Sequence, residues 1–231
     1  MKSQKRWSEQ KGENSWTMFK VLAEFVDGFE IMNKLGPCVS IFGSARIKED
    51  HPYYQLAVQI AEKLTDEGFG VITGGGPGIM EAGNRGAYLN KGLSVGLNIQ
   101  LPFEQFANPY IDHEKVLTHR YFFIRKVMFV KYSKAFIALP GGFGTLDELF
   151  EVMTLTQTSK IKRVPIVLVG KDFWTPLKDW IKHTMNDKFH FISPEDLELI
   201  PIMDEPEEIV KYISDFYDAD PTGGMLHNFE L

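Results

Sequence analysis

The sequence predicts an α/β domain in which helices cover both faces of a doubly wound, mainly parallel sheet. Short runs rich in Val, Ile and Phe alternate with longer segments of helical periodicity, and this alternation is typical of βαβ units. Glycine-bearing turns follow three of the strand-like runs, as they do where a strand leads directly into a helix. With 231 residues, the chain fits one large α/β domain better than two domains.

Six strands are expected where short runs of β-branched and aromatic residues are bounded by turn residues. Residues 101–118 contain Pro102 and Pro109, so we expect them to be irregular apart from a short strand near their end. The expected strands are 39–42, 69–73, 93–99, 115–117, 135–139 and 164–169.

Helices are expected where apolar residues recur at helical spacing, both between the strands and before the first one. Asn14 or Ser15 can cap the helix that precedes the first strand, while Gly68 and Gly92 end two of the later helices. The expected helices are 16–33, 54–67, 79–90, 119–132, 146–158, 174–185 and 207–217.

No repeat or linker interrupts this pattern. We therefore expect one domain over residues 16–217, which carries an extra N-terminal helix. A flexible segment is expected over 1–15. The C-terminal residues 218–231 contain Pro221, Gly223 and Gly224, so they are expected to form a loose tail.

The composition restricts the partners and the cellular compartment. A formal net charge of −6 argues against a general nucleic-acid binder, so any nucleotide ligand is expected to be small. Cys38 is the only cysteine, as expected in a reducing compartment. No apolar segment of signal-peptide length follows the polar start, and Arg125 and Lys126 interrupt the apolar run 122–130. We therefore expect a cytoplasmic protein that does not enter a membrane.

The segment 140–148, Pro-Gly-Gly-Phe-Gly-Thr-Leu-Asp-Glu, joins an apolar strand to a helix. Glycines in such a turn let backbone N–H groups approach a ligand, and the helix dipole adds partial positive charge. The turns at Gly43 and 74–78 also follow strands, so all three are expected at the sheet edge where ligands bind. Glu148, in the first helical turn, places a carboxylate beside the expected anion. This pattern indicates chemistry on a phosphorylated substrate.

Three common phosphate and metal sites match the chain poorly. Gly74 and Gly76 fit the first two glycines of a dinucleotide pattern, but Ile79 stands at the third, and the next strand offers Asn98 in place of an acid. A Walker A loop has no match, and the six histidines lack the paired spacing of a metal site. Met80 and the phenylalanines are expected in the core rather than against a ligand.

Arg125 and Glu148 each have a structural interpretation beside a functional one. Arg125 lies in a segment that is apolar on nearly every side, so its guanidinium needs an anion, which a structural ion pair would also supply. Glu148 fits a capping box with Thr145 as the N-cap, and such a cap is compatible with catalysis. His119 is expected to be a cap or surface residue, and Lys126 is expected to be solvated.

Together, residues 74–82, the pair Arg125-Lys126 and residues 140–148 resemble the LONELY GUY (LOG) family. Its members are cytokinin riboside 5′-monophosphate phosphoribohydrolases, long labelled as lysine decarboxylases. The resemblance covers about residues 36–215. It implies a Rossmann-like fold and hydrolysis of the N-glycosidic bond of a nucleoside 5′-monophosphate, either a cytokinin riboside 5′-monophosphate or AMP. No metal and no organic cofactor is implied.

The resemblance also assigns roles to individual residues. By this resemblance Glu148 stabilises the cationic sugar or activates water, whereas Arg125 holds ribose or phosphate oxygens and keeps Glu148 ionised. Arg125 and Glu148 match the family's catalytic pair; Gly141, Gly142, Gly144 and Thr145 match its phosphate loop; and Ser44, Gly75, Gly76 and Glu81 match positions that line the nucleotide pocket.

Other functions remain open at this point. A related fold carries molybdenum cofactor, so a nucleotide-binding or carrier protein without turnover is the first alternative. A lysine decarboxylase that uses pyridoxal phosphate is the second, although no lysine lies in either glycine turn. The N-terminal helix and the longer C-terminus resemble an extended, type II-like subgroup of the LOG family, which implies a homodimer or a higher oligomer such as a hexamer.

Overall fold

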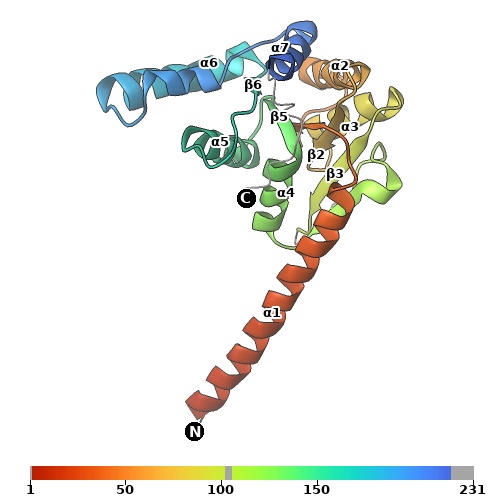
Figure 1. The fold of residues 1–231 in the computed structure, drawn as a ribbon, viewed down its shortest axis with the longest axis vertical. Coiled ribbons are helices and arrows are strands. Elements are labelled where there is room, and N and C mark those ends of the chain that lie inside the picture. Colours follow the sequence, from red (N-terminus) through yellow and green to blue (C-terminus); the bar gives the residue numbers. More distant parts are fainter. Residues whose placement is uncertain (1, 102–105, 220–231) are drawn as a thin grey trace.

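Six parallel strands form one sheet at the centre of the domain, which confirms the predicted α/β class (Figure 1). The computed structural model describes residues 2–101 and 106–219, except for the side chains of residues 2–14. Most of the expected tail, residues 220–231, lies outside the described residues. Neighbouring strands follow the order β4-β3-β2-β1-β5-β6. The strands are β1 (Cys38–Phe42), β2 (Gly70–Thr73), β3 (Ser94–Ile99), β4 (Val116–His119), β5 (Ser133–Ala138) and β6 (Ile166–Leu168).

Helices cover both faces of the sheet because side chains alternate between the faces along each strand. The α-helices are α1 (Lys2–Met32), α2 (Pro52–Asp66), α3 (Ile79–Leu89), α4 (Phe122–Tyr132), α5 (Phe143–Gln157), α6 (Lys171–Trp180) and α7 (Pro206–Asp218). In β1, Val39 and Ile41 belong to the apolar cluster formed with α2, α3 and α7. Cys38 and Phe42 belong to the opposite cluster, which includes residues of α1, α4, α5 and α6.

The N-terminal helix is longer than expected. It begins at Lys2 rather than Trp16, so residues 2–15 are helical although we expected them to be flexible. These residues lack an apolar stripe, but Lys, Arg, Gln and Glu are good helix formers and the segment continues a strongly periodic helix. Asn14 and Ser15 therefore lie inside α1 and do not cap it.

Other differences arise where helical and extended patterns overlap. The helix expected from His119 begins at Phe122, because residues up to His119 pair with β3 as strand β4. His119 is therefore not a cap or a surface residue; it is buried at the end of β4. After α6 the chain continues as a π-helix, η2 (Ile181–Lys188). Two short 3₁₀ helices were not predicted, η1 (His113–Lys115) and η3 (Pro194–Leu199).

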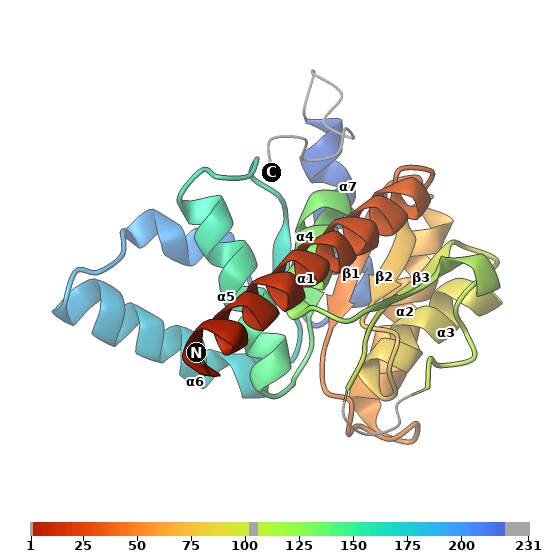
Figure 2. The same cartoon turned by 90° about the horizontal axis from the view of Figure 1, so that it is seen from below.

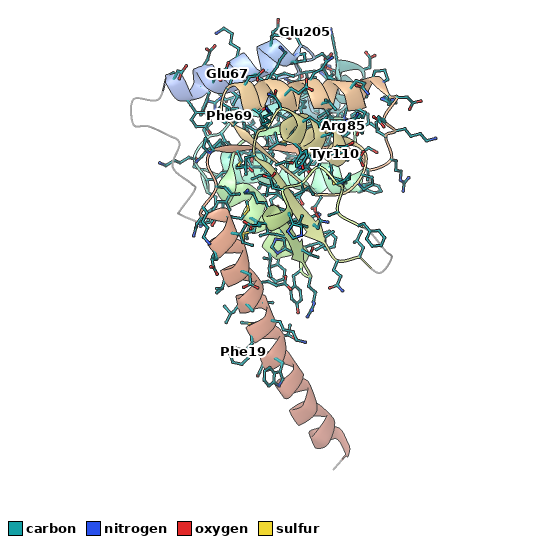
Figure 3. The ribbon with its side chains drawn as sticks, turned by 90° about the vertical axis from the view of Figure 1, so that its right-hand side faces the viewer. Phe19, Glu67, Phe69, Arg85, Tyr110 and Glu205 are labelled. Atoms are coloured by element: carbon teal, nitrogen blue, oxygen red, sulfur yellow. The ribbon has the colours of Figure 1, made fainter. Side chains whose placement is uncertain are left out.

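Helix α1 has two parts with different surroundings. Its second half packs on α4, where the ring centroids of Phe25 and Phe123 lie 6.4 Å apart and those of Phe29 and Tyr132 lie 6.5 Å apart. Seen from below, α1 crosses α4 (Figure 2). The part before this contact projects away from the sheet, and the exposed Phe19 lies on it (Figure 3).

The chain reverses its winding direction next to β1. Strands β2, β3 and β4 follow on one side of β1, whereas β5 and β6 lie on the other side. The last residues of the two central strands are in register, since Phe42 pairs with Ala138. The turns that follow β1, β2 and β5 therefore meet at one edge. In open α/β sheets such a reversal leaves a crevice where ligands bind.

Candidate functional site

A pocket of about 910 Å³ opens at this edge of the sheet. Its wall includes Gly43 after β1, Gly74 after β2 and Gly141 after β5, together with Arg125 from α4 and Glu148 from α5. The three glycine turns thus meet where the sequence predicts. Much of the remaining wall is apolar, and a concave apolar surface with a few convergent polar groups is typical of a site for a small molecule.

The predicted phosphate loop forms the start of α5. The helix begins at Phe143 with Gly142 at the N-cap position, and no side chain caps it. The capping box predicted for Thr145 and Glu148 is therefore wrong, because Thr145 already lies inside the helix and Glu148 lies in its second turn. The first N–H groups of a helix lack carbonyl partners within it, so they can bind an anion. All four predicted loop residues line the pocket: Gly141, Gly142, Gly144 and Thr145.

Steric contacts explain why one of these loop positions is glycine, and they show where the loop leaves space beside its backbone. A Cβ atom at Gly141 would overlap the side chain of Thr145, so a larger residue would displace the loop. A Cβ atom at Gly142 or Gly144 would meet no atom of the described residues within 4 Å. The space beside these two backbone positions is therefore available to a ligand.

Arg125 and Glu148 meet inside the pocket. Nη2 of Arg125 donates a hydrogen bond to Oε1 of Glu148 over 3.3 Å. The two side chains are only 13% and 6% exposed. The contact is single and long, whereas a structural arginine–carboxylate pair often has two short parallel hydrogen bonds. The pair therefore joins α4 to α5 without using all the donors of the guanidinium.

One donor of Arg125 is left without a partner. Its Nε atom is buried and has no hydrogen-bond partner among the described residues. The rings of Phe122 and Phe129 flank the guanidinium, with centroids 5.2 and 5.8 Å from Cζ, and restrict its orientation. A buried donor without a partner costs about 1–3 kcal/mol.

The carboxyl of Glu148 titrates near neutral pH. Burial raises its pKa to about 7, although Arg125 and Lys126 oppose this change. We predicted that Arg125 keeps Glu148 ionised; Arg125 does lower the pKa of this carboxyl, but burial outweighs the single ion pair. Near pH 7 both protonation states are populated. A carboxyl that exchanges a proton in this range is suited to acid–base chemistry.

Lys126 is not solvated as expected. Its Nζ atom lies 2.9 Å from Oδ1 of Asp147 and 3.2 Å from Oε2 of Glu151, and its side chain is 19% exposed. These contacts form a second link between α4 and α5, beside the Arg125–Glu148 pair. Lys126 thereby neutralises two carboxylates that would otherwise raise the pKa of Glu148 further.

Of the four predicted nucleotide-pocket residues, Ser44 lines the pocket. Its backbone N–H donates to the carbonyl oxygen of Pro140 over 3.0 Å, and its carbonyl oxygen accepts from the N–H of Ile79 over 3.0 Å. Ser44 therefore connects the turns after β1, β2 and β5. These backbone contacts hold the wall of the pocket together.

Gly75, Gly76 and Glu81 are not among the described residues that line the pocket. Gly75 has a φ of +72° and packs so closely on Asn98 that a Cβ atom would overlap its side-chain oxygen. The carbonyl oxygen of Gly76 accepts from Nδ2 of Asn108 over 3.1 Å. The hydroxyl of Tyr54 donates to Oε1 of Glu81 over 2.8 Å. In this structure Gly75 and Gly76 therefore pack the second glycine turn against Asn98 and Asn108, whereas Glu81 links α3 to α2.

Several apolar residues of the pocket wall were not predicted. Met80, which we expected in the core, lines the pocket, as do Phe122, Phe143 and Phe173. Phe143 lies within the phosphate loop and is 91% exposed. Its position between two glycines was a usable signal, because an aromatic side chain in such a loop has no core to enter. Met80 and Phe122 carried no such signal, since their spacing is also typical of buried helix faces.

Two further findings concern sites of other kinds. Within the part of the chain that the structure describes, no group of three His, Cys, Asp or Glu side chains is arranged to hold a metal ion. No described helix combines the length and the apolar character needed to cross a membrane.

Comparison with known proteins adds sequence relatives. A family model described as "Possible lysine decarboxylase" matches residues 80–213. The chain is similar to the "Probable cytokinin riboside 5'-monophosphate phosphoribohydrolase LOGL5" of Oryza sativa subsp. japonica, with 32% identity over 160 residues. That match covers 68% of this chain and 63%, less than two thirds, of LOGL5. LOGL3 of the same organism, whose name states the same activity, is 33% identical over 172 residues, which cover 69% of this chain and 78% of LOGL3.

Solved structures share the fold. The molybdenum cofactor binding protein from Rippkaea orientalis has a TM-score of 0.61 and 19% identity, with 79% of this chain and 98% of that chain covered. The molybdenum cofactor carrier protein from Chlamydomonas reinhardtii has a TM-score of 0.56 and 16% identity, with coverages of 78% and 97%. At these identities the similarity concerns the fold alone.

Proposed function

This chain belongs to the "Possible lysine decarboxylase" family, in which its curated relatives are LOG phosphoribohydrolases, and we propose that it hydrolyses a nucleoside 5′-monophosphate. The products are the free base and ribose 5-phosphate. The activity would be that of a nucleotide phosphoribohydrolase, similar to an AMP nucleosidase. Cytokinin riboside 5′-monophosphates and AMP are the two proposed substrates.

One observation carries this proposal: the Arg125–Glu148 pair lies in the same pocket as the uncapped N-terminus of α5. The helix N-terminus supports binding of a phosphate, and the buried carboxyl supports proton transfer at a distance from that phosphate. N-glycosidic hydrolysis of a nucleotide needs both, because the phosphate is not the group that reacts.

In the proposed reaction, the backbone N–H groups at the start of α5 bind the 5′-phosphate, which remains intact and orients the ribose. Water attacks C1′ while the bond from C1′ to the base breaks, and the sugar passes through a state with cationic character. Glu148 stabilises this charge or accepts a proton from the water. The electron pair of the broken bond stays with the base, which gains a proton. Arg125 holds ribose or phosphate oxygens.

A substrate screen tests the proposed activity. We expect free base to be released from AMP or from isopentenyladenosine monophosphate, and compare them with GMP, CMP and UMP, using chromatography of the products. The Glu148→Gln variant is measured in parallel as the inactive control. If none of the five nucleotides releases base above this control, the proposed hydrolase activity is wrong.

The pH dependence of the reaction reports on the form of Glu148 that acts. Glu148 has a pKa of about 7, so it is neutral well below this pH and charged well above it. We expect kcat/KM for AMP to rise with pH through this value, because the carboxylate is the active form. A value of kcat/KM that falls over the same interval would instead assign Glu148 the role of a general acid.

A substitution of Lys126 tests whether the pKa of Glu148 sets the pH dependence of kcat/KM. Replacing Lys126 with Met removes the positive charge that lowers the pKa of Glu148 and leaves Asp147 and Glu151 without their partner. We expect the rising limb of the profile to move to higher pH. Lys160→Met, at an exposed position after α5, is the matched control and should leave the limb in place.

The alternatives have weaker support. Similarity to molybdenum cofactor binding and carrier proteins is similarity of fold, and the curated relatives with higher identity are named phosphoribohydrolases. A decarboxylase that uses pyridoxal phosphate needs a lysine for the Schiff base. None of the described residues that line the pocket is a lysine, and the nearby Lys126 is bound to two carboxylates.

We propose a cytoplasmic enzyme that forms at least a homodimer. The single cysteine, Cys38, is buried and free, which is compatible with a reducing compartment. Trp16, Phe19 and Val26 of α1 are each more than 60% exposed, and apolar surface of this kind supports contact with a second subunit. Sedimentation measurements would establish the number of subunits.

A further inference from the structure

Glu24 of α1 reaches the turn between β4 and α4. Its Oε2 atom accepts a hydrogen bond from the backbone N–H of Arg120 over 3.0 Å. The same atom lies 4.0 Å from Nδ1 of His119, which is too far for a hydrogen bond. Burial lowers the pKa of His119, so its imidazole is predominantly neutral at pH 7. The contact with the Arg120 amide is therefore the stronger of the two, because only this contact has the length of a hydrogen bond.

Close packing between α1 and α4 fixes the position of Glu24. A Cβ atom at Gly28 would lie 2.6 Å from Cε of the buried Met128, so the missing side chain allows the two helices to approach. The hydroxyl of Tyr132 donates to Oδ1 of Asn33 over 2.6 Å, just after the end of α1. The Glu24 side chain is 20% exposed. It is thus part of a packed interface rather than a mobile surface group.

The turn that Glu24 holds leads directly to Arg125. Tyr121 is the N-cap residue of α4, and no side-chain hydrogen bond caps this helix at Tyr121. The carbonyl oxygen of Tyr121 accepts hydrogen bonds from the N–H groups of Ile124, over 3.2 Å, and Arg125, over 3.5 Å. A carboxylate at this end also complements the dipole of α4. Any shift of the turn therefore moves the backbone of Arg125.

We propose that Glu24 is a positioning residue for the nucleotide site. It acts through the Arg120 amide and the first turn of α4, and it keeps the guanidinium of Arg125 beside Glu148. This role presupposes the proposed hydrolase activity and gives the N-terminal helix a part in it. A displacement of about 1 Å at a reacting group can reduce a rate by about 10²-fold, so a single hydrogen bond at this place can affect activity.

The test compares two acidic residues of the same helix. Glu24→Ala removes the hydrogen bond, whereas Glu24→Gln keeps an oxygen that can accept it. Glu30 is the matched control, because it is exposed and its described ion pair is with Lys34 of the same N-terminal segment. We measure kcat and KM for AMP, and hydrogen exchange of the backbone amides 120–128 without nucleotide.

We expect Glu24→Ala to lower kcat/KM about tenfold and to speed exchange of these amides. Glu24→Gln should stay within about threefold of the wild type, and Glu30→Ala should match it. If Glu24→Ala lowers only the melting temperature, with kcat, KM and exchange unchanged, Glu24 is not a positioning residue. If the wild type cleaves no nucleotide, the hydrolase proposal fails separately. In that case the affinity for AMP and the exchange of the amides 120–128 test the role of Glu24. If both are the same in Glu24→Ala as in the wild type, Glu24 is not a positioning residue.

Discussion

Replacement of Glu148 with Gln is expected to lower kcat for base release by about 10³-fold while AMP still binds. Gln has nearly the same shape as Glu but cannot accept a proton from water or stabilise a cationic sugar by charge. The amide oxygen can still accept the hydrogen bond from Arg125, so the pocket should keep its geometry. Binding should persist because the substrate is an anion and the substitution removes a negative charge from the site.

Kinetics of base release and calorimetric titration with AMP measure the two effects separately. Glu195→Gln is the matched control, since it makes the same chemical change at an exposed position of η3. It should show the kinetics of the wild type. Near-normal turnover by Glu148→Gln would remove Glu148 from the mechanism and return it to a purely structural part in the link between α4 and α5.

Replacement of Arg125 with Ala is expected to weaken AMP binding about 10- to 100-fold and to lower kcat as well. Arg125 lines the pocket, where its guanidinium offers N–H donors to a ribose or phosphate oxygen. The variant also leaves Glu148 without its ion pair, so the pKa of this carboxyl should rise further. The effect on kcat should therefore be greatest at low pH.

Arg125→Lys provides a second variant for the same site. Lysine keeps the charge but lacks the planar fork that Phe122 and Phe129 orient, so we expect it to recover only part of the affinity. Circular dichroism checks that both variants are folded. AMP titration of Arg125→Ala that matches the wild type would make the Arg125–Glu148 contact a structural ion pair.

The arrangement of strands and helices could be predicted from the sequence because it depends on local periodicity and on turn residues. The alternation of short apolar runs, such as β1 and β5, with helical segments and the glycines that follow these runs indicated a parallel sheet with ligands at one edge. Element ends were less predictable. His119 belongs to β4 because β3 offers hydrogen-bond partners, and such pairing depends on residues far away in the sequence.

Part of the site could also be predicted. The resemblance to the LOG family assigned Arg125, Glu148 and the loop 141–145 to one site, and the structure brings them together in one pocket. The electrostatics could not be predicted, since proximity to Arg125 suggested an ionised Glu148 whereas burial raises its pKa to about 7. Burial is a property of the complete fold, so a local motif does not reveal it.

Tertiary contacts also changed the view of two charged residues. Lys126 looked solvated because its position on α4 was considered without α5, whose Asp147 and Glu151 bind it. Likewise, the sequence gave no reason to connect Glu24 with Arg120, because α1 and α4 are separated by most of the sheet in the chain. Such pairs become visible only when helices are placed against one another.

In the proposed reaction the phosphate only binds and orients the substrate, and the reacting centre is the glycosidic carbon. Phosphorus NMR of the wild-type protein with AMP tests this distinction directly. We expect the AMP signal to be replaced by that of ribose 5-phosphate, with free adenine formed in equal amount. Adenosine, incubated separately with the protein, should not be cleaved. Appearance of inorganic phosphate together with adenosine, or an AMP signal that does not change, would contradict the proposed reaction.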